Sequence, residues 1–510
     1  MQTFNNVINS INNVIWSDAL VYVLVGVGLY FTFATRGAQF RFIKQMFKHM
    51  FEKDESSAEI KLTPYQAFAA TVGCRVGTGN IAGVATAIYF GGPGAVVWMW
   101  ITALFGAASS LIESLLGSAY KDRYDNEICG GPAYYMERGL KSRPIGILYA
   151  LATLIGPVFM MSALQTKTSV VALSDAFGGS QILYSVIIAA LVAVVVVGGL
   201  RRIGKAAEII SPVMVAIFMV VGLVVMFANI GELPGVISIM FKSAFSPNSI
   251  YGAIFGSMVK WGVKRGLYSN DAGNGMGPIV SSAADCAHPV KQGLVQSLSV
   301  YIDTLLVCSI TAFTILLTGA YNVANIDETG YIVKGLPGVE YGISYSQEAM
   351  RSVLGYEFGG ILLAVIISVF VFSTLIAYGY QADASLRFLF GKKKWTAYIG
   401  RPLLLAGILL GGIVDGQVVW AMGDTGAGMM AWINLLAIAL LSPKAFKILK
   451  DYEKQKKAGL DPMFDPATVG IDDPNDVWTE WVEKKQARGD YENKELGYNL
   501  VSKAAQNSLK

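Results

Sequence analysis

Two glycine-rich stretches with embedded polar residues interrupt otherwise apolar parts of the chain, and both have the chemistry to bind a small charged solute. The first runs from Gly73 to Gly83 and reads GCRVGTGNIAG; the second runs from Gly262 to Pro278 and reads GVKRGLYSNDAGNGMGP. Glycine costs a helix up to about 1 kcal/mol per residue, so each stretch predicts an interrupted helix. Unwound backbone donates N–H groups to a carboxylate and offers carbonyl oxygens to a cation such as Na⁺. The two stretches therefore indicate a site for a zwitterionic amino acid that travels with sodium.

The rest of the chain is dominated by apolar runs that are long enough to cross a bilayer. Of its 510 residues, 54% are hydrophobic and only 15% are charged, unlike the balance of a soluble domain. A helix rises about 1.5 Å per residue and the hydrocarbon layer is about 30 Å thick, so about 20 apolar residues span it. We expect an all-α polytopic membrane protein with about eleven transmembrane helices, near residues 15–35, 64–90, 93–117, 144–175, 181–200, 207–230, 250–288, 291–320, 357–388, 396–414 and 417–441.

Lysine and arginine are distributed unevenly over the loops between these runs. One set of alternate loops contains 19 of them, whereas the other set contains only Lys242, Lys334 and Arg351. Cytoplasmic loops are enriched in these residues, so we expect the N-terminus outside, the C-terminus in the cytoplasm and a location in the cell (inner or plasma) membrane. Met1 to Asp18 carries no basic residue, so we expect the first helix to be retained rather than cleaved as a signal.

Several other classes of protein lack their sequence signatures here. The four cysteines are scattered without CxxC spacing and there are only two histidines, so neither a metal site other than sodium nor a disulfide framework is expected. The net charge of +4 is small and forms no basic amphipathic face, so we expect no nucleic-acid binding. Neither HExxH nor GxSxG occurs, and we predict no enzymatic activity and no cofactor.

The two interrupted spans are the second and the seventh in the series. A separation of five helices is expected for equivalent first members of two inverted five-helix repeats. The predicted organisation is an N-terminus with one extra helix and a basic loop (1–63), a first repeat (64–230), a second repeat (250–441) and a cytoplasmic charged tail (442–510). We expect the tail to be a partly ordered, solvated extension, with Trp478 and Trp481 suggesting some docking, and a regulatory or partner-binding role is the alternative. The alternative interpretation of the glycines is close packing between membrane helices.

Further motifs extend this pattern over most of the chain. They are VGTGNIAGVATAI (76–88), GGPGAVVWMW (91–100), GGPAYYMERG (130–139), KRGLYSNDAG (264–273), HPVKQGLVQ (288–296), FST (372–374) and WINLLAIALLS (432–442). From about Thr63 to Pro443 the sequence resembles the alanine or glycine:cation symporters, also called the sodium:alanine symporter family. The resemblance implies sodium-coupled uptake and a LeuT-type 5+5 inverted-repeat fold, preceded here by one extra N-terminal helix.

The resemblance also implies roles for individual residues. It places the backbone N–H groups of Thr78 and Gly79 at the substrate carboxylate, and Gln165 at the opposite wall of the substrate site. It places sodium at the backbone carbonyls of Gly73 and Val76. The amide side chain of Asn80 and the hydroxyls of Ser373 and Thr374 are the other implied sodium ligands. Taken alone, a Ser-Thr pair in a membrane helix more often bonds its own i−4 carbonyl, and a lone buried glutamine equally well joins two helices.

Three charged residues fall inside the expected spans close to the breaks. Asp271 is the best anionic partner for a substrate ammonium group or an ion, and its competing role is a salt bridge to Lys260, Lys264 or Arg265. Glu113 is a functional candidate because charge in a membrane is expensive. We expect it to accept a hydrogen bond from broken-helix backbone, with proton coupling as the alternative, and we expect Arg75 to neutralise it or a neighbouring acid.

The second break departs from the pattern that is usual in the family. Family members usually read SNEAGLGSAP where this chain reads SNDAGNGMGP, and a tryptophan usually stands four positions after FST, where this chain has Tyr378. We expect Gly273, Asn274, Met276 and Tyr378 to line the substrate pocket and to make it more polar. A change of this size is worth only about 1–3 kcal/mol, so an amino acid other than alanine or glycine stays open.

These observations predict a secondary active transporter that imports a small neutral amino acid, such as alanine or glycine, together with Na⁺. Proton coupling through Glu113 or Asp271 is a second hypothesis, as is transport of a different amino acid. A membrane nutrient sensor that binds its ligand without transporting it, with the charged tail as its output, is a third.

Overall fold

The structure is a computed structural model that describes residues 2–52, 62–124, 127–197, 199–245, 251–391 and 393–487. Within these ranges, seven helical stretches are long and apolar enough to cross a membrane. They are Val7–Ala34, Gly94–Ala119, Arg143–Phe177, Glu208–Ala228, Pro289–Leu317, Tyr356–Phe390 and Gly416–Leu440. Two shorter apolar helices, α11 (Gln181–Val196) and α20 (Ala397–Ile413), and two interrupted helices accompany them. The protein is a multi-pass membrane protein, and the count of eleven spans stays a prediction.

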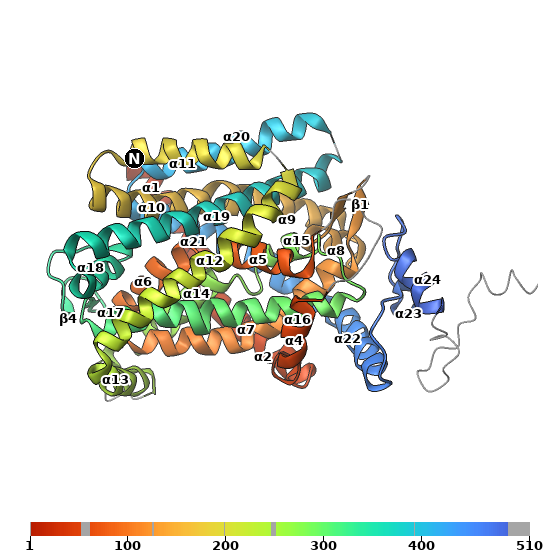
Figure 1. The fold of residues 1–510 in the computed structure, drawn as a ribbon, viewed down its shortest axis with the longest axis horizontal. Coiled ribbons are helices and arrows are strands. Elements are labelled where there is room, and N and C mark those ends of the chain that lie inside the picture. Colours follow the sequence, from red (N-terminus) through yellow and green to blue (C-terminus); the bar gives the residue numbers. More distant parts are fainter. Residues whose placement is uncertain are drawn as a thin grey trace, which may run out of the picture.

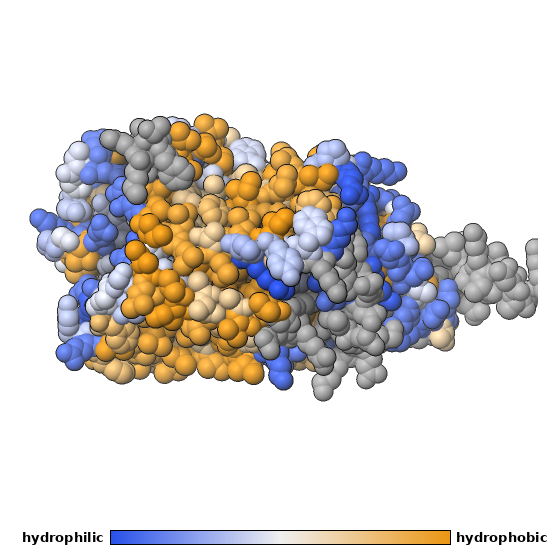
Figure 2. Space-filling view, turned by 90° about the horizontal axis from the view of Figure 1, so that it is seen from above, coloured by the Kyte–Doolittle hydropathy of each residue, from blue (hydrophilic) through white to orange (hydrophobic). Residues whose placement is uncertain are grey.

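The long helices lie along a common direction and present an apolar outer surface. Figure 1 shows α7 (Gly94–Ala119), α10 (Ser162–Phe177) and α19 (Tyr356–Phe390) running lengthwise through the molecule. Figure 2 shows a broad apolar zone between two polar ends. Exposed apolar side chains on the described helices include Leu191, Val220 and Val365. Hydrocarbon solvates such side chains well, so this zone corresponds to the bilayer.

The N-terminal region contains more structure than the single helix expected at 15–35. The chain forms α1 (Gln2–Ile15) and α2 (Asp18–Ala34), followed by the short helices α3 (Ala38–Arg41) and α4 (Ile43–Met50). Helix α1 packs against α21 (Gly416–Leu440), and Trp16 Nε1 donates a hydrogen bond of 2.8 Å to the Asp424 carbonyl oxygen. The N-terminal segment is therefore part of the helical core.

The first half of the core begins with an interrupted helix and ends with a long continuous one. Its elements are α5 (Pro64–Arg75), the π-helical η1 (Gly79–Gly83), α6 (Val84–Gly91), α7, β1 (Asp122–Tyr124), β2 (Glu127–Cys129), α8 (Pro132–Arg138), α9 (Arg143–Ile155), the π-helical η2 (Gly156–Met161), α10, α11 and α12 (Gly199–Ala228). The loop expected at 201–206 is wrong, because α12 already begins at Gly199. A helix is free to continue past the apolar layer, so its basic first turns need not be a loop.

The second half repeats the order of an interrupted helix followed by continuous ones. Its elements are η3 (Ile230–Glu232), α13 (Leu233–Phe245), η4 (Gly252–Ile254), α14 (Phe255–Asn270), α15 (Met276–Ser281), α16 (Pro289–Val300), the π-helical η5 (Tyr301–Cys308), α17 (Ser309–Leu317), β3 (Asn322–Ala324), β4 (Tyr331–Lys334), α18 (Ile343–Leu354), α19, η6 (Lys394–Thr396), α20 and α21. Strands β1 and β2 form one antiparallel hairpin and β3 and β4 another. The fold is thus mostly helical, and the all-α prediction misses two short hairpins in the connections.

Residues 442–487 of the tail form helices, where a partly ordered, solvated extension is expected from sequence. The helices are α22 (Ser442–Lys457), α23 (Pro466–Val469) and α24 (Thr479–Ala487). Trp478 is buried, with the Lys121 ammonium group 4.0 Å from its ring centre, and its Nε1 donates to the Ala119 carbonyl oxygen. Trp481 is buried as well. Residues 442–487 therefore dock on the helical core, while 488–510 lie outside the described residues.

Both glycine-rich stretches interrupt a helix, but over fewer residues than their composition predicts. The first interruption comprises Val76 and Gly77, and the second runs from Asp271 to Gly275. Gly262 and Gly266 lie inside α14, where added β-carbons would come within 2.5 Å of Trp98 Cβ and 3.1 Å of Thr102 Cβ on α7. The packing interpretation thus holds for these two glycines, which let α14 approach α7 closely.

Candidate functional site

The first break turns backbone groups away from the helix ladder in the protein interior. Helix α5 starts with a capping box, in which Thr63 and Gln66 bond each other's backbone, and it ends at Arg75. Val76 is extended, and the Gly77 N–H donates a hydrogen bond of 2.9 Å to Asn80 Oδ1. The Gly77 donor is thus used by a side chain, and nearby carbonyl oxygens become available to other partners.

Four of the five residues predicted to bind sodium converge at this break. The Thr374 hydroxyl donates to the Gly73 carbonyl oxygen at 3.0 Å and lies 3.4 Å from the Val76 carbonyl oxygen, while also reaching its own i−4 carbonyl at 3.1 Å. Ser373 Oγ lies beside them, 3.4 Å from the Ser211 hydroxyl on α12. A buried group of oxygen atoms from α5, α12 and α19 results. The sequence gives no signal for the participation of Ser211.

The residues predicted at the substrate carboxylate lie on the other side of the same break. The Thr78 N–H donates to Gln165 Oε1 at 3.0 Å, and Gln165 also hydrogen-bonds Tyr378. The Gln165 amide oxygen therefore accepts the hydrogen bond from Thr78 that the family resemblance assigns to the substrate carboxylate. Gly79 packs directly on α14, because an added β-carbon would lie 2.9 Å from Ser269 Cα.

The second break is held in shape by its own side chains. Asp271 has a left-handed backbone conformation with φ of 54°, and Gly273 and Gly275 also have positive φ. Asn274 Nδ2 donates to Asp271 Oδ1 at 2.9 Å, and the Met276 N–H donates to Asn274 Oδ1 at 3.0 Å. Asn274, one of the residues that departs from the family pattern, thus links the two ends of the break.

Glu113 secures this break from the neighbouring helix α7. Its Oε2 accepts hydrogen bonds from the Gly275 N–H at 3.1 Å and from Asn434 Nδ2 at 2.8 Å. Asn434 Nδ2 also reaches the Gly273 carbonyl oxygen at 3.0 Å, and Tyr149 donates to the Asn274 carbonyl oxygen at 2.8 Å. The expected contact between Glu113 and broken-helix backbone is present in the structure.

Arg75 lies at the end of α5 but bonds neutral groups rather than Glu113. Its Nη1 donates to the Gln296 carbonyl oxygen at 3.1 Å and to the Ser299 hydroxyl, and its Nη2 donates to the Ser110 hydroxyl at 3.1 Å. Among the described residues it forms no ion pair within 4.0 Å. Arg75 therefore forms no direct ion pair with Glu113, because it points toward α16, and its role in neutralising Glu113 or a neighbouring acid stays a prediction.

Asp303, which the sequence analysis does not single out, lies at the centre of a polar cluster between the two breaks. Its carboxylate accepts hydrogen bonds from Asn80 Nδ2 at 2.6 Å, from the Ser269 hydroxyl at 2.6 Å and from the Thr304 hydroxyl at 2.9 Å. Asn80, a predicted sodium ligand, therefore uses its amide oxygen for Gly77 and its amide nitrogen for Asp303. The signal was available, because Asp303 is an acid in an apolar span, as Glu113 is.

The basic residues of the second stretch pair with α21 rather than with Asp271. Lys264 Nζ lies 2.7 Å from Asp424 Oδ2, and Arg265 Nη1 lies 2.7 Å from Asp424 Oδ1. Lys260 pairs with Asp18 at 3.2 Å. The competing salt-bridge role for Asp271 is thus wrong, since Asp424, another acid that sequence reasoning missed, takes the two buried cations.

The buried acidic residues around the two breaks form no ion pairs with basic side chains among the described residues. Glu113, Asp271 and Asp303 are buried, and none of them lies within 4.0 Å of a basic side chain in the part of the chain that the structure describes. An isolated buried carboxylate is costly and normally has a paired cation or a proton. This arrangement can therefore accept cationic partners, either an ion or an ammonium group.

Two neighbouring hollows lie at the end of the molecule that contains the turn at Asp415. One has a volume of about 550 Å³ and the other of about 800 Å³, and both are lined by Tyr89, Tyr341, Gln417 and Trp420. Lys264, Arg265 and Asp424 line the smaller hollow. The buried ion-paired group of Lys264, Arg265 and Asp424 thus forms part of the wall of this hollow.

Comparison with known proteins agrees with this geometry. The sequence profile of the sodium:alanine symporter family matches residues 1–466. The chain belongs to this family. The family resemblance found in the sequence is thereby confirmed. Family membership implies a membrane carrier rather than an enzyme.

Relatives in the sodium:alanine symporter family match nearly the whole chain. YrbD of Bacillus subtilis (strain 168), provisionally named a sodium/proton-dependent alanine carrier protein, is 45% identical over 471 residues, covering 92% of this chain and 96% of YrbD. GlnT of the same organism, provisionally named a sodium/glutamine symporter, is 39% identical over 463 residues, covering 91% of this chain and 94% of GlnT.

The fold is also found among solved membrane transporters. A crystal structure of a mutant manganese transporter of Eremococcus coleocola superposes with a TM-score of 0.51 at 13% identity, covering 87% of this chain and 99% of that chain. At such low identity the likeness concerns the fold alone. This chain therefore shares its fold with a distant transporter.

Proposed function

We propose that this protein is a sodium-coupled symporter that imports a small neutral amino acid. The observation that carries the proposal is the Thr374 hydroxyl, which bridges the Gly73 and Val76 carbonyl oxygens at the first break. Hard cations prefer oxygen ligands, and three such oxygens meet here in a buried place. We assign Na⁺ to this position, with Ser373 as a further ligand. Membership of the sodium:alanine symporter family supports the assignment.

The Thr374 hydroxyl has a second hydrogen-bond acceptor, so its proton keeps a partner when its oxygen coordinates an ion. A hydroxyl carries one proton and two lone pairs, so it coordinates a cation only when its proton points elsewhere. The i−4 carbonyl oxygen of Phe370 lies 3.1 Å from the hydroxyl and is available for that proton. Rotation of the Thr374 hydroxyl toward Phe370 then leaves the three oxygens free to face the ion.

We assign the amino-acid substrate to the space between the two breaks. In the structure the Thr78 N–H donates to Gln165 Oε1. The substrate carboxylate would replace this amide oxygen and accept hydrogen bonds from the Thr78 and Gly79 N–H groups. Asp271 would face the ammonium group from the second break. We assign the substrate side chain to the surface formed by Gly273, Asn274, Met276 and Tyr378.

The identity of the side chain is the open part of this assignment. YrbD is named for alanine and GlnT for glutamine, so relatives of similar identity differ in substrate. Asn274 adds polarity to the expected pocket, which suits alanine, glycine or a polar neutral amino acid. A competition screen of amino acids against binding to the purified protein, with and without sodium, ranks these substrates directly.

Uptake into proteoliposomes tests the sodium assignment. Thr374→Val removes the bridging oxygen with little change in volume, and loss of such a bond costs about 1.5–3 kcal/mol, or roughly tenfold or more in sodium affinity. Thr311→Val on α17 is the matched control, because the Thr311 hydroxyl bonds only its own i−4 carbonyl at 3.4 Å. Equal uptake by the unmodified protein with potassium or choline in place of sodium would sink the proposal.

Proton coupling is a second candidate, favoured by the buried acids that lack ion pairs. Asp303, Asp271 and Glu113 each have hydrogen-bond donors around them but form no ion pair within 4.0 Å among the described residues. The name of YrbD includes protons as well as sodium. A pH gradient that drives uptake in sodium-free vesicles, and fails to do so in Asp303→Asn, would establish this coupling.

We further propose that residues 64–230 and 250–441 form two inverted repeats that rock against each other, and that the protein lies in the cell membrane with its N-terminus outside. The hollows near Asp415 lie on the predicted outer side, and the docked tail lies on the predicted cytoplasmic side. Cysteine labelling from each side of the membrane at Lys242 and Lys141 positions tests this orientation. Labelling of both positions from the same side would contradict it.

A further inference from the structure

The short helix α4 and the residues beside it present three different faces. Successive side chains of a helix are separated by about 100°, so positions three or four apart share a face. One face is buried and consists of Met46, His49 and Met50. A second face is apolar and exposed, and comprises Phe40, Ile43, Phe47 and Phe51, which are 40%, 43%, 48% and 65% exposed. A third is basic and exposed, and comprises Arg41, Lys44 and Lys48.

An exposed apolar stripe beside a basic stripe is the pattern of a helix that lies in the membrane interface. The apolar side chains enter the acyl boundary, while lysine and arginine extend their charged ends to the headgroups. Arg41 pairs with Glu453 at 2.8 Å, whereas Lys44 and Lys48 have no ion pair among the described residues. Their charge is therefore available to an external anion.

The orientation of α4 also suits this location. Figure 1 shows α4 lying crosswise to α7 and α16, at the same end of the molecule as α22. The transmembrane direction is that of α7 and α16, so α4 runs roughly in the plane of the bilayer surface. Its loop belongs to the set that is rich in basic residues, which is the predicted cytoplasmic side.

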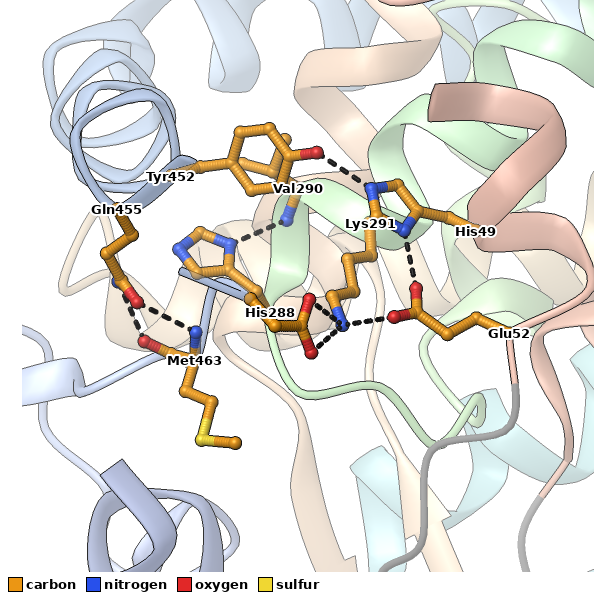
Figure 3. Close-up of polar contacts among 9 residues, drawn as sticks. His49, Glu52, His288, Val290, Lys291, Tyr452, Gln455 and Met463 are labelled. Carbon is orange, nitrogen blue, oxygen red and sulfur yellow. Dashed lines mark hydrogen bonds and ion pairs between the residues drawn. The ribbon is translucent and has the colours of Figure 1, made fainter. Parts of the chain in front are cut away.

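The buried face of α4 is connected to the beginning of α16. His49 Nε2 lies 2.7 Å from the Tyr452 hydroxyl and His49 Nδ1 lies 2.5 Å from Glu52 Oε2. Lys291 Nζ on α16 lies 3.0 Å from Glu52 Oε1 and 3.1 Å from Asp461 (Figure 3). Burial opposes the ionisation of Glu52, but His49 and Lys291 outweigh it and lower its pKa to about 2. The carboxylate is therefore charged at neutral pH and holds α4 to α16.

We propose that the exposed face of α4 binds anionic lipid headgroups of the cytoplasmic leaflet, and that the bound lipid steadies the cytoplasmic end of α16. The basic face of α4 attracts the anionic headgroups, and the exposed apolar face adds free energy of binding by burying its side chains in the hydrocarbon. Helix α16 continues into η5, which carries Asp303. A lipid bound at α4 therefore acts on the helix that holds a buried acid of the transport site.

Lipid retention by the purified protein tests the binding step independently of transport. Protein extracted from membranes that contain phosphatidylglycerol is compared by native mass spectrometry with Lys44→Gln/Lys48→Gln. The control Lys141→Gln/Lys242→Gln removes two exposed charges that lie outside α4. We expect the α4 variant to retain roughly tenfold less phosphatidylglycerol, and the control to retain as much as the unmodified protein. Equal retention by all three proteins would overturn the proposal, as would displacement of the lipid by millimolar inorganic phosphate.

Uptake tests the consequence for α16. In vesicles of phosphatidylcholine with increasing phosphatidylglycerol, we expect the rate of uptake by the unmodified protein and the control to rise several-fold, and that of Lys44→Gln/Lys48→Gln to stay flat. A parallel rise in all three would show that surface charge acts elsewhere and would overturn the coupling to α16. Phe47→Ser, which keeps every charge, is expected to weaken retention at high salt, and unchanged retention would remove the apolar face from the proposal. Absence of uptake in every protein would refute the proposed function, while the retention experiment would still test lipid binding.

Discussion

Glu113 accepts a hydrogen bond of 3.1 Å from the backbone N–H of Gly275, so a carboxylate of α7 fixes the interrupted part of the α14–α15 helix. The same oxygen receives Asn434 Nδ2 from α21. Three helices are thereby joined at one atom, and the second break is fixed by groups outside its own sequence as well as by Asn274 within it.

Replacing Glu113 with glutamine separates structure from proton coupling. Glutamine keeps one oxygen that accepts from Gly275, so we expect Glu113→Gln to retain sodium-driven uptake within a few-fold. Glu113→Leu removes the acceptor and leaves Gly275 unpaired at a cost of about 1–3 kcal/mol, so its uptake should fall by roughly tenfold or more. Loss of pH-driven uptake in Glu113→Gln, with sodium-driven uptake intact, would instead assign a proton to this acid.

Two glycines of α14 provide a matched test of packing against conformational freedom. An added β-carbon at Gly262 would come within 2.5 Å of Trp98 Cβ and 2.7 Å of the Ala95 carbonyl oxygen, whereas Gly256 has open space within 4 Å. We expect Gly262→Ala to lower the free energy of unfolding by about 1–3 kcal/mol. Gly256→Ala should leave it unchanged or raise it by up to about 1 kcal/mol, because alanine favours the helix. Thermal unfolding in detergent measures both, and equal shifts would contradict the packing role.

Asp424 balances two buried cations, so its removal should be costly. Breaking a buried pair by removing one partner typically costs about 3–5 kcal/mol, because the remaining charge is left without compensation. We expect Asp424→Asn to lower the unfolding temperature strongly. Asp18→Asn, which breaks the exposed pair with Lys260, is the control and should have little effect. Similar unfolding temperatures for the two variants would show that Lys264 and Arg265 find other partners.

The docked tail should loosen in weak acid through His288, which lies just before the membrane span of α16. Its Nδ1 accepts from the Val290 N–H and its Nε2 lies 3.1 Å from Asp451, with Lys291 and Lys485 as the basic groups nearby. Burial lowers the pKa of His288, although Asp451 opposes the shift.

Because the unfolded value is 6.5, the contribution of His288 is complete above about pH 6.5 and is lost as the pH falls below it. Glu52 contributes above its unfolded value of 4.5 and loses this only as the pH falls toward 2. We therefore expect protease cleavage of the tail in inside-out vesicles to increase between pH 6.5 and 4.5. His288→Asn keeps a side-chain acceptor for the helix start and does not titrate, so its cleavage should be independent of pH in this range. The same pH profile in both proteins would rule out His288.

Local composition predicts the two breaks because glycine-rich stretches do not support a continuous helix in any surroundings. It does not predict how far each break extends. Gly262 and Gly273 are alike as residues, yet the first packs against α7 and the second turns the backbone, with φ of 94°. Which of these roles a glycine has depends on the helix that lies beside it, and that helix is distant in sequence.

The side chains that meet across the site are harder to foresee for the same reason. Asp303, Asp424 and Asn434 each stand alone in an apolar span, and most of their partners come from other helices. The rule that charge in a membrane is expensive applies to the two acids as it does to Glu113, so they were open to prediction. Asn434 offers no comparable signal. The convergence of Gly73 and Thr374 was expected only through the family resemblance, and their assignment to sodium stays a prediction.

Three π-helical segments, η1, η2 and η5, lie along the helices that build the site. A π-helical turn bonds i to i+5 and so accommodates an additional residue compared with an α-helical turn. Deleting one residue from η5 would restore α-helical bonding and remove the widened turn that sets how the residues around Asp303 face the site. The length of the chain at these turns thus specifies the site as much as residue identity does. A one-residue gap there in a relative would mark an altered ion or solute preference even where every ligand residue is retained.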